Sequence, residues 1–375
     1  MLPRARSQTC DVLIAGGGPA GASAALALRR QGATVIVADP GRSQEWKPGE
    51  TLSAKAGPLL EGLGVLDRVT VGPHTPCFGY ESAWGGNGLS GTEFLLDPLG
   101  PGWHLDRVRF DSVLLDAARD AGARQRRGYI RSLQRRTGHW RITLGGEPVL
   151  ARYVIDATGA SAGVARRVGA QVRRDDRLVA LATRLPLGAA HRDVPRTSLV
   201  ESVPLGWWYT APLPGGTILV MAVTDADVAA RYALHRPEVW WRQLTTTTHL
   251  RARLRLRTTR PSFALRIARA STSRACPAAG PGWAAVGDAA TATDPIAARG
   301  ITTALATGIS AADAVRADAD GTTLSLQRYA ERVAAVHSEY LQARTVCYGI
   351  EQRWDTPFWT RRRPEPGSSS RDLGA

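Results

Sequence analysis

The sequence predicts an α/β protein in which a β-rich segment interrupts a domain of parallel strands and helices, and a helical segment follows. Three observations lead to this fold class. Residues 11–28 run in the order apolar stretch, glycine turn and alanine-rich stretch. A second apolar run, residues 34–38, ends at the acidic Asp39. A third apolar run late in the chain ends at Gly287-Asp288. Alternating strands and helices are typical of a parallel sheet covered by helices.

The glycine turn has the G-x-G-x-x-G spacing between a predicted strand and a predicted helix. In this motif the first glycine permits a sharp turn, the second lets backbone amides approach a pyrophosphate, and the third lets the helix pack closely. Pro19 falls in the first turn of the predicted helix, where its missing N–H costs no hydrogen bond. The N-terminus of that helix attracts anions. Asp39 stands where an acid can accept hydrogen bonds from a ribose. The motif predicts a Rossmann-like dinucleotide site, either for NAD or for FAD, with contacts from Gly16, Gly18, Pro19, Ala20, Gly21 and Asp39.

Composition limits the compartment and the class of protein. A chain of 375 residues favours two packed domains. No apolar run approaches eighteen residues, and the first strand begins too early to leave room for a signal peptide. The four scattered cysteines form no zinc-binding or disulfide pattern and suit a reducing compartment. We therefore expect a cytoplasmic protein with no membrane association and no metal site.

The formal net charge of +15 raises the question of an anionic partner. Lysine occurs only at Lys47 and Lys55, so the excess is arginine, clustered at residues 124–127, 251–257 and 361–363. These clusters are interpreted as solvated surface or, alternatively, as docking sites for an acidic protein or peptide. Nucleic acid is not expected, because no recognition module is visible.

Gly287-Asp288, together with the Asp-Pro…Gly-Ile run at 294–301, resembles the group of FAD-dependent aromatic hydroxylases and flavin halogenases. The resemblance implies that FAD is the cofactor and that Asp288 lies on its ribityl chain. It also implies that the helix beginning near Gly300 and Ile301 points its N-terminus at the flavin ring, with Pro295 in the preceding turn. Arg107 matches the arginine that opens the flavin-contacting helix of this group. The segment 156–159 resembles a turn beneath the cofactor, and a purely structural role is equally open.

Within that group the chain is most similar to LodB-type maturation flavoproteins, which serve oxidases whose quinone cofactor is made from a tryptophan. Four stretches carry this resemblance: residues 47–52, 103–111, 206–214 and 351–362. It implies a monooxygenase that hydroxylates an aromatic substrate through a flavin C4a-hydroperoxide, with a tryptophan side chain in a partner protein or peptide as the substrate. Electrons would come from NAD(P)H directly or through a separate flavin reductase. The oligomeric state is left open.

Other functions stay open with less support. A halogenase would carry W-x-W-x-I-P, but Tyr209 and Ala211 replace two of the fixed residues of that motif. Halogenases of this group also use a lysine well downstream of their Gly-Glu pair, and here Lys55 follows Glu50 by only five residues. A flavin reductase or dehydrogenase that inserts no oxygen is a further alternative. The last alternative is a non-catalytic flavoprotein that chaperones a partner.

Candidate catalytic residues are Glu50 and His104, as proton acceptor or acid–base groups, although the sequence favours a structural role for each of them. Trp207, Trp208 and Tyr209 are candidate substrate-binding residues that could stack on an indole, with a place in the sheet core as the alternative. The expected FAD-binding domain is discontinuous, over 1–70, 104–170 and 266–320. The expected β-rich substrate domain covers 71–103 and 171–265. A helical segment at 321–363 and a disordered tail at 364–375 complete the chain.

Overall fold

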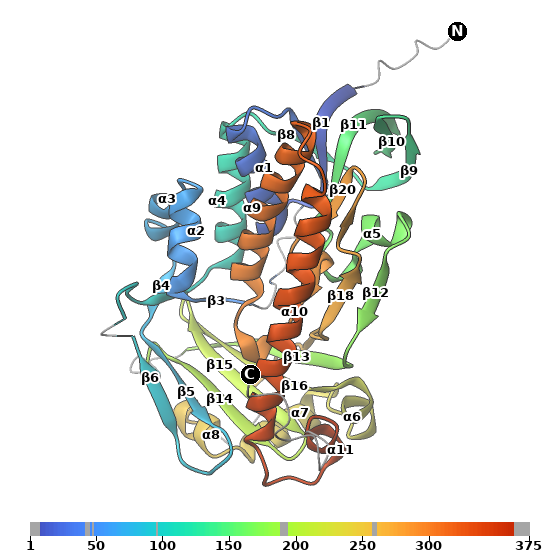
Figure 1. The fold of residues 1–375 in the computed structure, drawn as a ribbon. Coiled ribbons are helices and arrows are strands. Elements are labelled where there is room, and N and C mark those ends of the chain that lie inside the picture. The colour runs from blue at the N-terminus through green and yellow to red at the C-terminus, as the bar shows by residue number, and fades with distance from the viewer. Residues whose placement is uncertain are drawn as a thin grey trace, which may run out of the picture. The chain divides into compact units, whose positions relative to one another are not determined.

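The computed structural model describes residues 8–41, 46, 49–94, 97–187, 194–256 and 261–363. The predicted disordered tail, and Lys47 and Pro48, lie outside the described residues. The chain forms two compact units (Figure 1). Unit 1 comprises residues 1–74, 105–175 and 271–337, and unit 2 comprises 75–104, 176–270 and 338–375. The unit boundary at 337/338 falls inside the segment that the sequence groups as one helical region.

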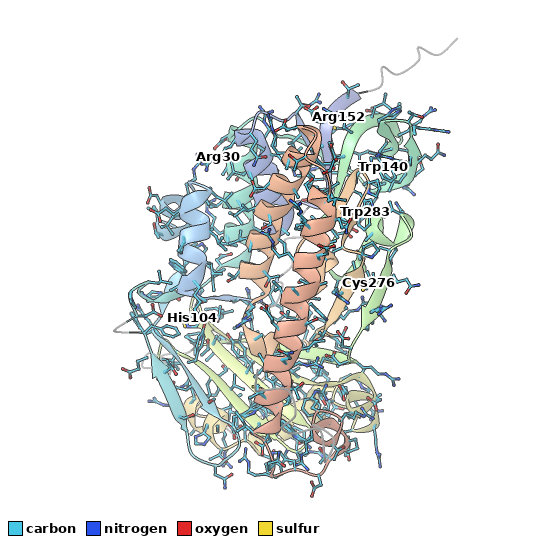
Figure 2. All side chains as sticks on the ribbon, viewed as in Figure 1. Arg30, His104, Trp140, Arg152, Cys276 and Trp283 are labelled. Carbon is cyan, nitrogen blue, oxygen red and sulfur yellow. The ribbon has the colours of Figure 1, made fainter. Side chains whose placement is uncertain are left out.

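Unit 1 is built on a sheet in the order β19-β20-β11-β1-β2-β8, and β9 and β10 extend it from β11. Strands β20, β11, β1, β2 and β8 run parallel, as predicted. Residues 130–144 form the hairpin of β9 and β10. Trp140, labelled in Figure 2, donates from Nε1 to Gly282 O at 2.8 Å. The strands are β1 (Gln8–Ala15), β2 (Val35–Asp39), β8 (Arg124–Arg127), β9 (Ile130–Arg136), β10 (His139–Leu144), β11 (Glu147–Asp156), β19 (Ala279–Gly280) and β20 (Trp283–Ala285).

Helices α1 and α9 of unit 1 pack against each other, and α4 lies on the other side of α1 (Figure 1). Small residues allow the close approach of α1 and α9.

The helices assigned to this unit are α1 (Pro19–Arg30), α2 (Gly57–Gly62), α3 (Leu66–Thr70), α4 (Arg107–Asp120), α5 (Gly163–Arg167) and α9 (Gly300–Ala319). Single 3₁₀ turns are η1 (Ala54–Ala56), η2 (Gly159–Ser161), η4 (Gly287–Ala289) and η5 (Pro295–Ala297). A small sheet joins β12 (Gln171–Arg174), β18 (Ser273–Cys276) and β21 (Thr291–Ala292), and β3 (Thr51–Leu52) also lies in unit 1. Helix α10 (Ser325–Gly349) begins in unit 1.

Gly308 on α9 is the closest point of this helix pair. A Cβ at this position would lie 2.2 Å from Ser23 Oγ and 2.6 Å from the backbone oxygen of Ala20. We expect Gly308→Ala to lower the free energy of unfolding by about 1–3 kcal/mol, because the helices must move apart. Gly62→Ala on α2 is the control, since its Cβ would meet no atom within 4 Å and alanine favours helix. Urea unfolding of both variants tests this, and equal stability would contradict it.

Unit 2 contains a seven-stranded sheet in the order β17-β13-β16-β15-β14-β5-β6. All its neighbouring strands are antiparallel except β14 and β5. The strands are β5 (Gly79–Ala83), β6 (Ser90–Glu93), β13 (Leu178–Pro186), β14 (Ser198–Val203), β15 (Gly206–Leu213), β16 (Thr217–Asp225) and β17 (Arg266–Arg269). A separate antiparallel pair is β4 (Thr75–Cys77) and β7 (Gly102–His104). The helices are α6 (Ala226–Arg231), α7 (Pro237–Thr245), α8 (His249–Arg253) and α11 (Pro357–Thr360).

The core of unit 2 lies between its sheet and α7. Trp208 on β15 contacts Trp240 on α7, with ring centroids 4.8 Å apart, in an apolar cluster that includes Leu181, Val220 and Leu244. Trp240 is fully buried, and its Nε1 donates to Leu181 O. The apolar face of α7 thus covers one side of the sheet.

None of the helices in the described residues combines the length and the apolarity that a membrane span requires. Over the same ranges, no three His, Cys, Asp or Glu side chains gather in a way that could hold a metal ion.

Candidate cofactor site

The glycine turn between β1 and α1 is too tight for side chains at two of its positions. Gly16 has φ +112°, and a Cβ there would lie 2.3 Å from Ala157 O. A Cβ on Gly21 would lie 2.0 Å from Gly16 O. The Gly16 amide donates to Ala38 O at 2.8 Å, which ties the turn to β2. Gly16 and Gly21 therefore serve the turn and the packing, as the motif predicts.

Gly18 differs from these two glycines. It is the N-cap residue of α1, ahead of Pro19, and no protein atom lies within 4 Å of the place that its Cβ would take. Open space thus faces the first turn of a twelve-residue helix whose N-terminal amides have no intrahelical partners. The dipole of such a helix favours an anion at this end. This opening fits the pyrophosphate of a dinucleotide.

Asp39 ends β2 beside the glycine turn. It is 7% exposed, and its Oδ1 accepts from the Gly41 amide at 3.0 Å. A Cβ on Gly17 would lie 2.3 Å from Asp39 Oδ2. Gly17 is therefore the residue that allows the acid to approach the turn. The motif spacing does not single out Gly17, although a run of three glycines is a visible signal.

Asp288 reaches the same region from the other end of the chain. Gly287 has φ +58°, and a Cβ on it would lie 2.8 Å from Ala20 Cβ on α1, so η4 sits against the start of that helix. The Gly287 amide also donates to Thr307 Oγ1 on α9 at 2.8 Å. Asp288 itself is exposed to solvent although protein surrounds it closely. We interpret an exposed side chain in crowded surroundings as a carboxylate that lines a recess in the protein surface. Burial raises the pKa of Asp288, and the charge of Arg107 opposes that effect.

Arg107 opens α4, which Asp106 caps by accepting from the Arg109 amide at 3.0 Å. Its Nη1 donates to Gly49 O at 2.9 Å, and its Nη2 lies 3.2 Å from Asp111 Oδ1. The side chain is only 11% exposed. These contacts hold a cation close enough to Asp288 to influence its titration.

The N-terminus of α9 is open. Asp294 is fully buried, and its Oδ1 accepts from the Ile296 amide at 3.0 Å, which fixes the turn that begins at Pro295. Ala298 adopts the left-handed conformation at φ +48°, and Gly300 is exposed while Ile301 is buried. Helix α9 spans 300–319, so it begins at Gly300, where the resemblance implies its start. Its first amides can stabilise negative charge placed before them.

The hydrogen bonds of Asp156 indicate a structural role for this residue. Its Oδ1 accepts from the amide and hydroxyl of Thr158 at 2.9 and 2.6 Å, and its Oδ2 accepts from the amides of Val164 and Ala165 at 2.8 and 2.7 Å. Both carboxylate oxygens are thereby used to hold the start of α5. Of the two interpretations that the sequence left open for the segment 156–159, these bonds favour the structural one.

The two candidate acid–base residues are both buried. Glu50 in unit 1 is 1% exposed and accepts from Trp46 Nε1 and from the Gly49 amide. His104 in unit 2 is fully buried, and burial lowers its pKa to about 4. Its imidazole is therefore neutral at pH 7 and holds no extra proton to donate. The catalytic roles of both residues stay predictions.

The three aromatic candidates on β15 do not share a face, because successive side chains of a strand point to opposite sides. Trp208 points into the core against α7. Trp207, 1% exposed, donates from Nε1 to Tyr348 OH at 3.0 Å, and the half-buried Tyr209 contacts Ser198 Oγ through its hydroxyl. The prediction that all three stack on one substrate is corrected here. Trp207 and Tyr209 stay as candidates.

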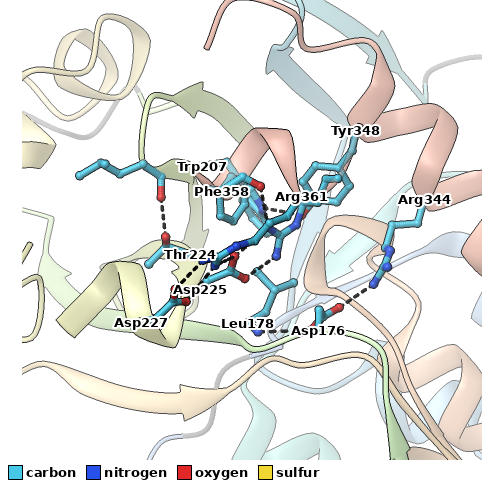
Figure 3. A network of polar contacts seen from close by, with 12 residues as sticks. Asp176, Leu178, Trp207, Thr224, Asp225, Asp227, Arg344, Tyr348, Phe358 and Arg361 are labelled. Carbon is cyan, nitrogen blue, oxygen red and sulfur yellow. Dashed lines mark hydrogen bonds and ion pairs between the residues drawn. The ribbon is translucent and has the colours of Figure 1, made fainter. Parts of the chain in front are cut away.

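The arginine cluster at 361–363 is paired within unit 2 (Figure 3). Arg361 lies 2.7 Å from Asp227 and 3.0 Å from Asp225, and Arg362 lies 2.6 Å from Asp225. Arg363 pairs with Asp355 at 2.6 Å. The hydrogen bonds that Arg361 donates to Asp227 and Asp225 raise its pKa further. The interpretation as solvated surface holds for Arg361, whose side chain is 45% exposed, whereas Arg362 is buried in its pair with Asp225; these ion pairs hold the end of the chain to β16 and α6.

Glu351 anchors the same region. It is fully buried, and it accepts from the Gly85 amide at 3.0 Å, from Ser202 Oγ at 2.6 Å and from the Arg353 guanidinium at 2.5 Å. Burial alone would raise its pKa, but the hydrogen bonds from Arg353, Ser202 and Gly85 lower it to about 2.

We expect Glu351→Gln to cost about 1–3 kcal/mol of unfolding free energy at pH 7, because the buried carboxylate that accepts from Gly85, Ser202 and the half-buried Arg353 is lost. The folded-state pKa lies below the unfolded value of 4.5, so this stabilisation is complete above pH 4.5 and disappears as pH falls towards 2. Denaturant unfolding from pH 7 to pH 3 should show the two proteins converging. A constant difference across that range would contradict the ionic role.

The comparisons with known proteins agree with this geometry. Residues 88–372 match the family model described as tryptophan halogenase, and residues 11–51 match an FAD-binding domain. The chain is 27% identical to the putative FAD-dependent oxidoreductase LodB of Marinomonas mediterranea over 368 residues, covering 95% of this chain and 97% of that protein.

Two solved structures have similar folds. The flavin-dependent halogenase CmlS matches with a TM-score of 0.84 at 22% identity, over 97% of this chain and 69% of that one. The peptidyl tryptophan dihydroxylase QhpG, described as essential for tryptophylquinone cofactor biogenesis, matches with a TM-score of 0.76 at 24% identity, over 96% and 80%. Both likenesses confirm the predicted α/β fold with a Rossmann-like FAD-binding domain.

Proposed function

We propose, from the premise that this chain belongs to the tryptophan halogenase family, that it is a monooxygenase that hydroxylates an aromatic ring. The family and its relatives make the chain an FAD-dependent oxidoreductase. The proposed substrate is a tryptophan side chain within a protein or peptide. The likeness to LodB over nearly the whole of both chains supports this choice, as does the likeness to a peptidyl tryptophan dihydroxylase.

The distribution of lysine is the observation that favours hydroxylation over halogenation. The chain has no lysine after Lys55, which is exposed on η1. Halogenases of this family use a lysine between flavin and substrate to deliver the halogen. Arginine is a poor substitute because it is effectively always protonated, so it offers no free amine to carry a halogen.

The residues of unit 1 fit FAD. The open N-terminus of α1 at Gly18 would hold the pyrophosphate, and Asp39 would accept from the ribose. Asp288, with Arg107 beside it, would bind the ribityl hydroxyls. Bound and reduced FAD supplies the electrons that activate dioxygen for insertion into the ring. The free amides at the start of α9 would stabilise negative charge on the reduced ring.

The chain's own aromatic residues would orient the substrate. The half-buried Tyr209 would contact the substrate, and the buried Trp207, held by its hydrogen bond to Tyr348, would support it from within β15. A rigid aromatic side chain positions an indole at little cost in entropy. We further propose that NAD(P)H supplies the electrons, directly or through a separate reductase. We also propose a reducing, cytoplasmic location, because Cys10, Cys77, Cys276 and Cys347 form no disulfide in the described part of the chain.

The test is to reduce the holoenzyme without air and then admit oxygen in the presence of chloride and bromide. Free tryptophan and tryptophan-containing peptides are offered, and product masses are measured. Gain of one or two oxygen atoms on peptide is the expected result. Peroxide formation with every substrate unmodified would count against oxygen insertion. Omitting a reductase and supplying only NADPH or NADH shows whether the enzyme accepts hydride directly.

Halogenation is the second candidate, because the family model and the fold of CmlS favour it as much as the relatives above favour hydroxylation. The same experiment separates them: a product that gains chlorine or bromine would establish halogenation without the lysine.

A further inference from the structure

Unit 1 contains a pocket of about 990 Å³ that shares no residue with the proposed FAD site. It is lined by residues of β9, β11, β12, β18 and α10, with Asp318 near the end of α9. Asp318 lies eighteen residues along α9 from Gly300, which at 1.5 Å per residue is about 27 Å from the helix N-terminus. The pocket is thus at the opposite end of α9 from the proposed flavin contact. Figure 2 labels two of its residues, Arg152 and Cys276.

Four arginines line this pocket: Arg135, Arg152, Arg173 and Arg274. Over the described residues, no ion pair joins any of these four guanidiniums to a carboxylate within 4 Å. Arg135 lies over the Trp140 ring at 4.9 Å, and Arg152 lies 5.9 Å from the Tyr153 ring centroid. The acids of the pocket are Asp318 and Glu331, and both accept hydrogen bonds from neutral groups, Tyr153 OH and Gln327 Nε2 respectively. Cationic groups therefore outnumber the acids in the lining.

Two of the arginines are direct neighbours across strands. Arg173 on β12 pairs in register with Arg274 on β18, and both side chains line the pocket. Like charges directly opposite each other on a sheet are destabilising. A pair of this kind is expected where an anion lies between the two guanidiniums, because Arg forks match phosphate oxygens.

Much of the remaining lining is apolar. Ala275, Ala278 and Ala279 come from the β18–β19 region, and Leu326, Ala330 and Ala334 come from α10. A mostly apolar wall with a few convergent polar groups is the usual composition of a small-molecule site, and the volume is within the usual range. Burial, and then the hydrogen bond to Asp318, raise the pKa of Tyr153 to about 12, so its phenol stays protonated.

We propose that this pocket binds a phosphate monoester with an apolar or aromatic body. Such a group carries close to two negative charges at pH 7 and three acceptor oxygens, which suits the paired arginines, while its body would cover the alanine-lined wall. A nucleoside monophosphate and an isoprenyl phosphate share this chemistry.

The test is calorimetric titration of the FAD-loaded protein, freed of excess FAD, with AMP, geranyl phosphate and inorganic phosphate. At least one ester should bind at least about tenfold more tightly than inorganic phosphate, because only an ester can use the apolar wall. Preference for AMP would identify a nucleotide, and preference for geranyl phosphate would identify a lipid-like ester. Failure of both esters at millimolar concentration, or equal affinity for inorganic phosphate, would overturn the proposal.

Arg274→Gln is the variant, and Arg174→Gln is its matched control. Arg174 neighbours Arg173 on β12, points to the opposite face and is exposed. Arg274→Gln should weaken the bound ester about 10- to 100-fold, whereas Arg174→Gln should leave its affinity unchanged. Without ligand, Arg274→Gln should melt at or above the wild-type temperature, because it relieves the repulsion from Arg173. A lower melting temperature together with unchanged ester affinity would mean that Arg274 is only structural. Flavin content should be unchanged in both variants, which separates this site from the proposed enzymatic function.

Discussion

Gly18→Val should purify folded but almost free of FAD. The Cβ of the new side chain would meet none of the described atoms within 4 Å, so we expect the fold to be preserved while the side chain occupies the opening at the N-terminus of α1. Loss of two charge-assisted hydrogen bonds, each of about 1.5–3 kcal/mol, would weaken FAD binding about 100-fold or more. Flavin absorbance of the purified protein and FAD titration of the apoprotein measure this.

The control for Gly18→Val is Gly57→Ala, at a second glycine whose Cβ would meet nothing within 4 Å. Its FAD content and melting temperature should match the wild type. Gly21→Ala should behave differently from both, because its Cβ would lie 2.0 Å from Gly16 O and the turn itself must deform. Normal FAD content in Gly18→Val would show that the pyrophosphate is not bound at this helix end.

Asp288→Ala should lose both FAD and product formation. The carboxylate lies beside α1 and within the field of Arg107, and its removal takes away the acceptor proposed for the ribityl hydroxyls. One such interaction is worth about 1–3 kcal/mol, so FAD affinity should fall about 10- to 100-fold. Asp288→Asn keeps an acceptor oxygen and should retain more FAD than Asp288→Ala.

Asp288→Ala also separates an enzyme from a chaperone. If the chain acts only by binding a partner, a variant without FAD would still support maturation of that partner. The monooxygenase proposal requires that FAD binding and product formation are lost together. Mass spectrometry of a peptide substrate, run beside a flavin assay, gives both readings from one preparation.

The sequence could predict what neighbouring residues decide together. The packing of Gly21 on Gly16 and the capping of the helix that begins at Arg107 by Asp106 depend on contacts within a few positions. Backbone sterics, helix capping and strand periodicity act at that range, so they leave a readable pattern. The α/β fold followed from these patterns, and the family resemblance added FAD.

Only the tertiary structure decided how distant residues meet. Arg361 finds Asp225 across 136 positions, which turned an apparent docking patch into internal ion pairs. The packing of α7 against β15 placed Trp208 in the core, on the face opposite Trp207 and Tyr209. Gly287 brought Asp288 to α1, and the register of β12 with β18 placed Arg173 beside Arg274. Strand register and helix packing are set by the sum of many apolar contacts, so no short stretch of sequence predicts these long-range contacts.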